Sequence, residues 1–66
     1  MNVIINGTAR QVTRGGTVRD AVRLVTAAAT GVAAAVNDEV VSRTAWDSTL
    51  LSDGDRVEVL TAVQGG

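Results

Sequence analysis

The sequence predicts an α+β fold in which one main helix lies across one face of a mixed β-sheet. Three observations predict it: a strand–turn–strand pattern around Asn6-Gly7, apolar residues at helical spacing after Thr17, and an alternating apolar run from Arg56 to Val63. The full predicted order is strand, strand, helix, strand, strand, irregular segment, strand. With 66 residues and no internal repeat, we expect one small domain over 1–66.

The first two strands form the clearest local pattern. The β-branched residues Val3, Ile4 and Ile5 lead into Asn6-Gly7, a pair that favours the positive φ angles of a two-residue hairpin turn. The return strand is predicted over 9–12. Side chains alternate along a strand, so Ile4 faces outward if Val3 and Ile5 face the core.

A single helix is predicted next. Gly15-Gly16 is expected to be a flexible entry to it, Thr17 is its N-cap, and Asp20 completes a capping-box spacing. Gly31 is expected to end it. Two arginines should face solvent while an apolar stripe faces the core. The arginines are Arg19 and Arg23, and the stripe comprises Val18, Ala21, Val22, Val25, Ala28 and Ala29.

The second half of the chain predicts two more strands and a loop. The small apolar run 32–36 is typical of a strand buried on both sides, and 39–41 resumes as a short strand after the turn Asn37-Asp38. The segment 43–51 has no clean period and predicts an irregular or short helical stretch. Its expected apolar anchors are Trp46, Leu50 and Leu51.

The last strand follows a tight turn at 53–55, which has too few oxygen ligands for a calcium loop. With Val57 and Val59 facing inward, Leu60 faces outward. Ile4 and Leu60 would then form a small exposed apolar patch on the sheet face away from the helix. We interpret this patch as a docking surface for a partner.

The chain ends on an unhindered arm. Gly65 and Gly66 have no Cβ atoms, so they can enter a channel too narrow for a side chain, and they bury no apolar surface of their own. We therefore predict that the terminal carboxylate is handled by another protein. The flexible tail that enters the partner's active site comprises Val63, Gln64, Gly65 and Gly66.

Composition excludes several classes of function. The chain has no Cys, His, Lys or Tyr, so it lacks the usual nucleophiles, bases and zinc ligands, and we expect neither an enzyme nor a metal site. A net charge of −1 argues against nucleic-acid binding. No signal peptide or membrane-spanning run is visible, which predicts a soluble cytoplasmic protein.

Several segments together resemble the β-grasp, ubiquitin-like sulfur carriers of the ThiS type, which serve thiamine biosynthesis. They are Asn6, Gly16-Thr17-Val18, the run 36–41, Arg43 with Trp46, the run 53–58, and the terminal Gly65-Gly66. The resemblance spans the whole chain. The combination of Arg43, Trp46, the Asp-Gly-Asp turn and the glycine pair is more specific than the glycine pair alone.

The resemblance implies a chemistry for Gly66. Its carboxylate would be adenylated by an adenylyltransferase that resembles ubiquitin-activating enzymes, and sulfur from a donor such as a cysteine desulfurase would convert it to a thiocarboxylate. Thiazole synthase would then accept the sulfur. ATP and Mg²⁺ belong to the activating partner, so the chain itself binds no cofactor.

Other functions remain open at this point. The small subunit of molybdopterin synthase has the same fold and tail, and carriers for cysteine or secondary metabolites differ only in the acceptor enzyme. A protein modifier would be joined to lysines of its targets through Gly66. A passive β-grasp interaction module would not need the tail at all.

Overall fold

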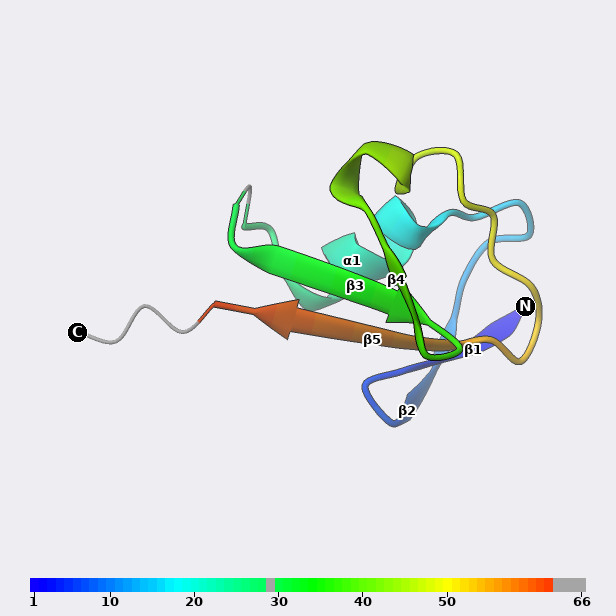
Figure 1. Cartoon of the computed structure of the whole chain (residues 1–66). Coiled ribbons are helices and arrows are strands. Elements are labelled where there is room, and N and C mark those ends of the chain that lie inside the picture. The colour runs from blue at the N-terminus through cyan, green and yellow to red at the C-terminus, as the bar shows by residue number, and fades with distance from the viewer. Residues whose placement is uncertain (29, 63–66) are drawn as a thin grey trace.

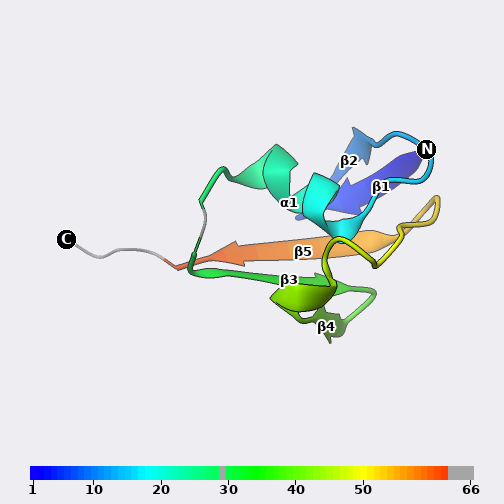
Figure 2. The ribbon, with the colours of Figure 1, turned by 90° about the horizontal axis from the view of Figure 1, so that it is seen from above.

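The computed structural model describes residues 1–28 and 30–62, and these form a five-stranded sheet with a helix across one face (Figures 1 and 2). The strand order is β2-β1-β5-β3-β4; β1 and β5 are parallel, and the other neighbours are antiparallel. The predicted α+β architecture is therefore confirmed. The elements are β1 (Asn2–Ile5), β2 (Thr8–Gln11), α1 (Val18–Val25), β3 (Val32–Val36), β4 (Glu39–Val41), the 3₁₀ turn η1 (Arg43–Ala45) and β5 (Arg56–Thr61).

The predicted hairpin turn between β1 and β2 is confirmed, and Asn6 does more than turn the chain. Asn6 and Gly7 have φ angles of 49° and 81°. The pairing of β1 with β5 reaches only as far as Ile5 and Val57. Beyond it, the Asn6 side chain donates to the Val59 carbonyl at 3.1 Å and accepts from the Val59 N–H at 2.8 Å. The amide thus extends the sheet ladder where the backbone of β1 has turned away.

The start of α1 follows the prediction. Thr17 and Asp20 form the reciprocal capping box. The N–H of Val18 donates to the Thr49 carbonyl at 3.0 Å, and the N–H of Arg19 donates to the Trp46 carbonyl at 3.3 Å. Because the first N–H groups of a helix have no partner within it, the 46–49 segment completes the cap.

The end of α1 was predicted wrongly. The helix ends at Val25, and the backbone of the next residue, Thr26, is extended. Val25 and Ala28, which were expected in the buried stripe, are exposed. Alanine favours helix locally, but buried apolar contacts decide where a short helix ends, and they stop at Val22. Gly31 is not the helix cap; with φ 70° it lies beside Ala62, and its carbonyl accepts from the Ala62 N–H at 2.6 Å. Ala29 lies outside the described residues.

Gly16 is a packing requirement and not a flexible entry. It is buried, and its carbonyl accepts from the N–H of Leu51 at 2.9 Å. A Cβ at this position would lie 2.5 Å from a methyl of Val12 and 2.9 Å from the Thr13 carbonyl oxygen. Contacts this short would force the surrounding atoms to shift, so glycine is what lets the chain fold back this closely on Val12 and Thr13.

The core lies between the sheet and α1, with Trp46 closing one side. Leu51 is buried as predicted, but Leu50 is 66% exposed, so its side chain does not belong to the core. The expectation that β3 is buried on both sides is also wrong, because Ala34 is buried while Ala33 is exposed. The buried side chains are Val3, Ile5, Val12, Val18, Ala21, Val22, Ala34, Trp46, Leu51, Val57 and Val59.

Arg19 also departs from its predicted place on a solvated face. Its guanidinium lies over the Trp46 ring, 5.7 Å from the centroid, and forms an ion pair with Asp47. Arg23, one turn later, is exposed as expected. The difference arises because Arg19, in the first turn, contacts Trp46 and Asp47, and the position of these two residues beside the helix is not given by the sequence alone.

Candidate functional site: the outer sheet face and the end of β5

The strand that leads to the tail is the central strand of the sheet. β5 lies between β1 and β3, and β3 pairs with it from Val32 opposite Thr61 to Val36 opposite Val57. The Ala62–Gly31 hydrogen bond continues this pairing one residue further. The chain is therefore fixed up to Ala62. The predicted tail, Val63, Gln64, Gly65 and Gly66, lies outside the described residues.

The face of the sheet away from α1 is open (Figure 2). Ile4 and Leu60 both point to it, with 37% and 69% of their surfaces exposed, whereas Val57 and Val59 face the core. The alternation predicted for β1 and β5 is thus observed. Both side chains line one shallow hollow of about 280 Å³.

The two residues do not form one compact patch. Ile4 lies opposite Arg56, so Leu60 is four residues further along β5, about 13 Å at the usual strand rise. The exposed Glu58 lies between them on the same strand face. The apolar neighbours of Leu60 come from the other side of β5 instead.

Those neighbours extend the apolar surface across β3 to β4. Ala33 lies opposite Leu60, and Ala35 lies opposite Val40, which is 82% exposed. These residues line a second small hollow together with Leu60. We call Leu60, Ala33, Ala35 and Val40 the outer apolar face.

The sequence did not predict this surface, because β3 was expected to be buried on both sides; the residues left out are Ala33, Ala35 and Val40. The alternation in β4 could have found Val40, since Val41 packs against the core and its neighbour must then face away.

The charged residues on this face are already engaged with the fold in part. Arg56 forms an ion pair with Asp38 at 2.9 Å, on an exposed edge where such pairs contribute little.

Within the described residues there is no group of acidic, His or Cys side chains that could hold a metal ion. No described helix is long and apolar enough to cross a membrane. What the site offers is a rigid strand end beside an exposed apolar surface. Such an arrangement can bind a protein and present a chain terminus to it.

Comparisons with known proteins agree on one family. The ThiS family model matches residues 3–66. The chain is 29% identical to the sulfur carrier protein ThiS of Escherichia coli (strain K12) over 66 residues, with both chains covered completely. A crystal structure of the thiamine biosynthesis protein ThiS from Geobacter metallireducens superimposes with a TM-score of 0.79 at 36% identity, again with complete coverage of both chains.

A solution structure of the thiamine biosynthesis protein from the same organism gives a TM-score of 0.80 at 33% identity. It covers all of this chain and 88% of the other. The fold, the strand order and the family match all lead to the same assignment. The chain therefore belongs to the ThiS family, the sulfur carrier proteins of thiamine biosynthesis.

Proposed function

We propose that Gly66 carries the sulfur, as a C-terminal thiocarboxylate that is used to form the thiazole ring of thiamine. The observation that carries the proposal is the family match, which runs through to residue 66, where the chain ends on two glycines. The fixed end of β5 supports it, because a rigid strand delivers whatever follows it in one direction. The match to ThiS favours thiazole formation over the molybdopterin alternative.

The proposed reaction has three steps, all of which take place on partner proteins. A Gly66 carboxylate oxygen attacks the α-phosphorus of ATP, and pyrophosphate leaves. A persulfide on the sulfur donor then attacks the acyl carbon and AMP leaves; cleavage of the new disulfide by a thiol gives the thiocarboxylate. The adenylate is needed because a carboxylate oxygen is a poor leaving group. The chain supplies the acyl group and needs no catalytic side chain of its own.

Intact mass tests the proposal directly. After incubation with an adenylyltransferase of the ubiquitin-activating type, ATP, Mg²⁺ and a persulfide donor, we expect a mass increase of one oxygen-to-sulfur exchange, confined to the C-terminal peptide. Omission of ATP is the control and should leave the mass unchanged. Sulfur found elsewhere in the chain would contradict the carrier function, and an isopeptide bond to lysines of other proteins would identify a protein modifier.

The outer apolar face is the proposed docking surface for these partners; Ile4 lies apart from it, beyond Glu58 on the same side of the sheet. Holding a tail costs about 1–2 kcal/mol of backbone entropy per residue, so contacts with a preformed surface must offset that cost. Leu60 is the largest exposed side chain near the end of β5 and should contribute most.

Leu60→Arg should therefore weaken binding to the adenylyltransferase and to thiazole synthase by at least about tenfold, roughly the burial of one leucine. Leu50→Arg is a matched control, because Leu50 is 66% exposed but lies in the segment that pairs with Thr17, away from this face. Binding is measured by calorimetry and folding by circular dichroism. Equal affinities for the two folded variants would show that partners dock elsewhere.

A further inference from the structure

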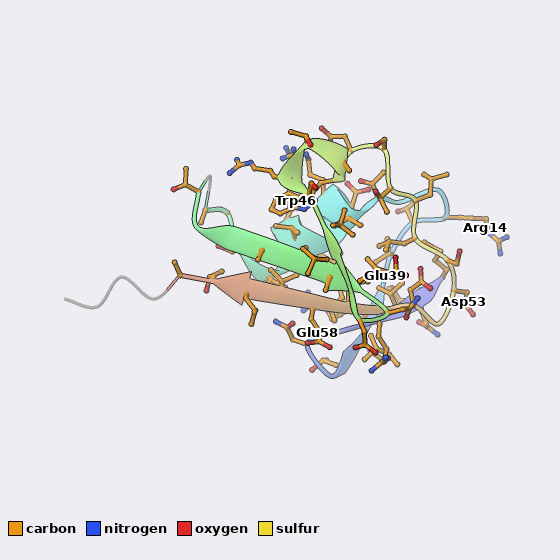
Figure 3. All side chains as sticks on the ribbon, viewed as in Figure 1. Arg14, Glu39, Trp46, Asp53 and Glu58 are labelled. Atoms are coloured by element: carbon orange, nitrogen blue, oxygen red, sulfur yellow. The ribbon has the colours of Figure 1, made fainter. Side chains whose placement is uncertain are left out.

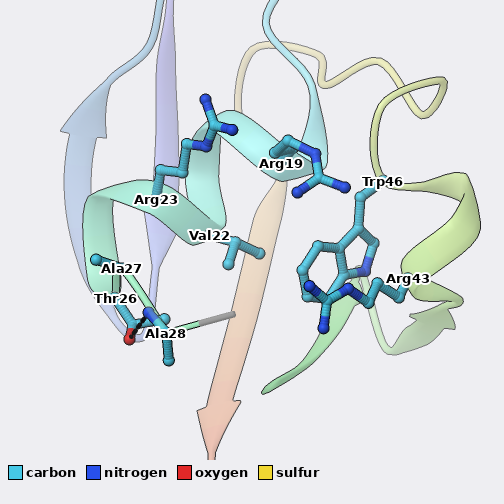
Figure 4. Close-up of a pocket in the computed structure, with 8 residues that line it drawn as sticks. All are labelled: Arg19, Val22, Arg23, Thr26, Ala27, Ala28, Arg43 and Trp46. Carbon is cyan, nitrogen blue, oxygen red and sulfur yellow. Dashed lines mark hydrogen bonds between the residues drawn. The ribbon is translucent and has the colours of Figure 1, made fainter. Parts of the chain in front are cut away.

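A second surface, on the helix side of the sheet, has no role in the function proposed above. A hollow of about 420 Å³ lies between the second half of α1 and η1 (Figure 4). Arg19, Arg23 and Arg43 line it around Trp46. Half of the six arginines of a chain with net charge −1 thus border one hollow. We call this surface the Arg–Trp groove.

The positive charge of the groove is only partly neutralised by the fold. Arg19 pairs with Asp47, but Arg23 and Arg43 form no ion pair with any residue in 1–28 or 30–62. The guanidinium carbons of Arg19 and Arg43 each lie 5.7 Å from the centroid of the same indole. Arg19 and Arg23 are also one turn apart on the helix, an arrangement that is repulsive for like charges. A bound anion would relieve this repulsion.

The floor of the groove is apolar. Val22, Ala27 and Ala28 line it beside the indole. The indole N–H is already engaged, because it donates to the Val41 carbonyl at 3.0 Å. An occupant must therefore bring anionic groups for the rim and an apolar group for the floor. Carboxylates suit the rim, since the guanidinium fork binds them in a bidentate way.

A nucleic acid fits this surface poorly. Non-specific binding of a strand relies on exposed aromatic rings on which bases stack, together with a basic track along its backbone. Trp46, the only aromatic residue, is 3% exposed, and two guanidinium groups lie over its ring. Only three basic side chains border the hollow, and one of them, Arg19, is paired with the carboxylate of Asp47.

We propose that the Arg–Trp groove docks an acidic segment of a partner protein, with Asp or Glu side chains on Arg23 and Arg43 and an apolar side chain against the exposed Ala27 and Ala28. The groove is lined by residues of α1 and of the 43–46 segment, whereas the outer apolar face belongs to β3, β4 and β5, and the two surfaces share no lining residue. Occupation of one surface therefore leaves the other open, and the inference does not depend on the chemistry at Gly66.

The sole tryptophan makes the groove directly observable. The full chain is titrated with a synthetic peptide of alternating Glu and Leu residues, capped at both ends, and Trp46 emission and backbone amide NMR shifts are followed. The groove variant is Arg23→Gln/Arg43→Gln. The matched control is Arg10→Gln/Arg14→Gln, which removes the same charge from exposed sites; Arg14 projects from the N-terminal end of the molecule, apart from Trp46 (Figure 3).

We expect the peptide to change the amide NMR shifts of α1 and η1. The control variant should bind the peptide with an affinity within about twofold of the parent. The groove variant should lose at least about tenfold in affinity, as expected for two charge-assisted contacts. Arg23→Gln alone, at an exposed site, should give a smaller loss and keeps the test valid if the double variant is unfolded. Three results would overturn the proposal: no binding to the parent, equal losses in the groove and control pairs, or tighter binding of an oligothymidylate than of the peptide.

Discussion

Removal of Gly66 is expected to abolish thiocarboxylate formation completely, because the reacting carboxylate would move back by one residue. Gly65→Val should lower the rate of adenylation by more than about 100-fold, since even a small misplacement of a reacting group has an effect of this size. A branched Cβ restricts the backbone angles and widens the chain where it enters the partner. Intact mass after a timed reaction with ATP measures both effects.

Gln64→Val is the matched control for Gly65→Val, because position 64 already carries a side chain and is expected to tolerate a branched one. All three variants should unfold at the same urea concentration as the parent, since the core lies entirely within residues 3–59. Near-normal adenylation of Gly65→Val would show that the partner's channel is wide. A loss of equal size in Gln64→Val would show that the requirement is not specific to glycine.

The second large effect is on stability. Trp46→Ala should remove about 3–5 kcal/mol, against a total of only about 3–5 kcal/mol expected from a core of this size. The indole is buried, its N–H donates to the Val41 carbonyl, and the guanidinium groups of Arg19 and Arg43 lie over its ring. One residue thus links β4, η1 and the helix start. We expect a largely unfolded variant in circular dichroism at 25 °C.

Leu50→Ala serves as the control for this substitution, because Leu50 lies four residues later and is exposed. The free energy of unfolding of Leu50→Ala, obtained from its urea midpoint, should lie within about 0.5 kcal/mol of that of the parent. A Trp46→Ala variant that unfolds cooperatively within about 1 kcal/mol of the parent would contradict this account of the core.

Features that depend on neighbouring residues were predictable from the sequence. The Asn6-Gly7 turn, the Thr17–Asp20 capping box and the alternation in β5 each depend on residues within a few positions of one another. Their preferred dihedral angles and hydrogen bonds are local, so no knowledge of the rest of the fold is needed. The order of the elements along the chain followed from the same local patterns.

Features set by packing between distant segments were not predictable. The glycine at position 16 is required by contact with Val12, and the early end of α1 reflects the lack of a surface beneath its last turn. For the same reason Arg19 was placed in solvent although Asp47, 28 residues away, binds it. In the site, the alternation of side chains along β1 and β5 predicted that Ile4 and Leu60 are exposed. The distance between them could not be predicted, because it depends on the register of β1 against β5.

The hydrogen bond between Ala62 and Gly31 limits how far the C-terminal carboxylate can reach into a partner protein. It is the last contact that holds the chain to the sheet among the described residues, and four residues follow it. Fully extended, four residues span at most about 14 Å. If Gly66 is the reacting residue, the reactive centre of every partner must lie within about 14 Å of the point where Ala62 rests on its surface. Different partners that use the same carrier therefore share one upper limit, about 14 Å, on the length of the active-site tunnel.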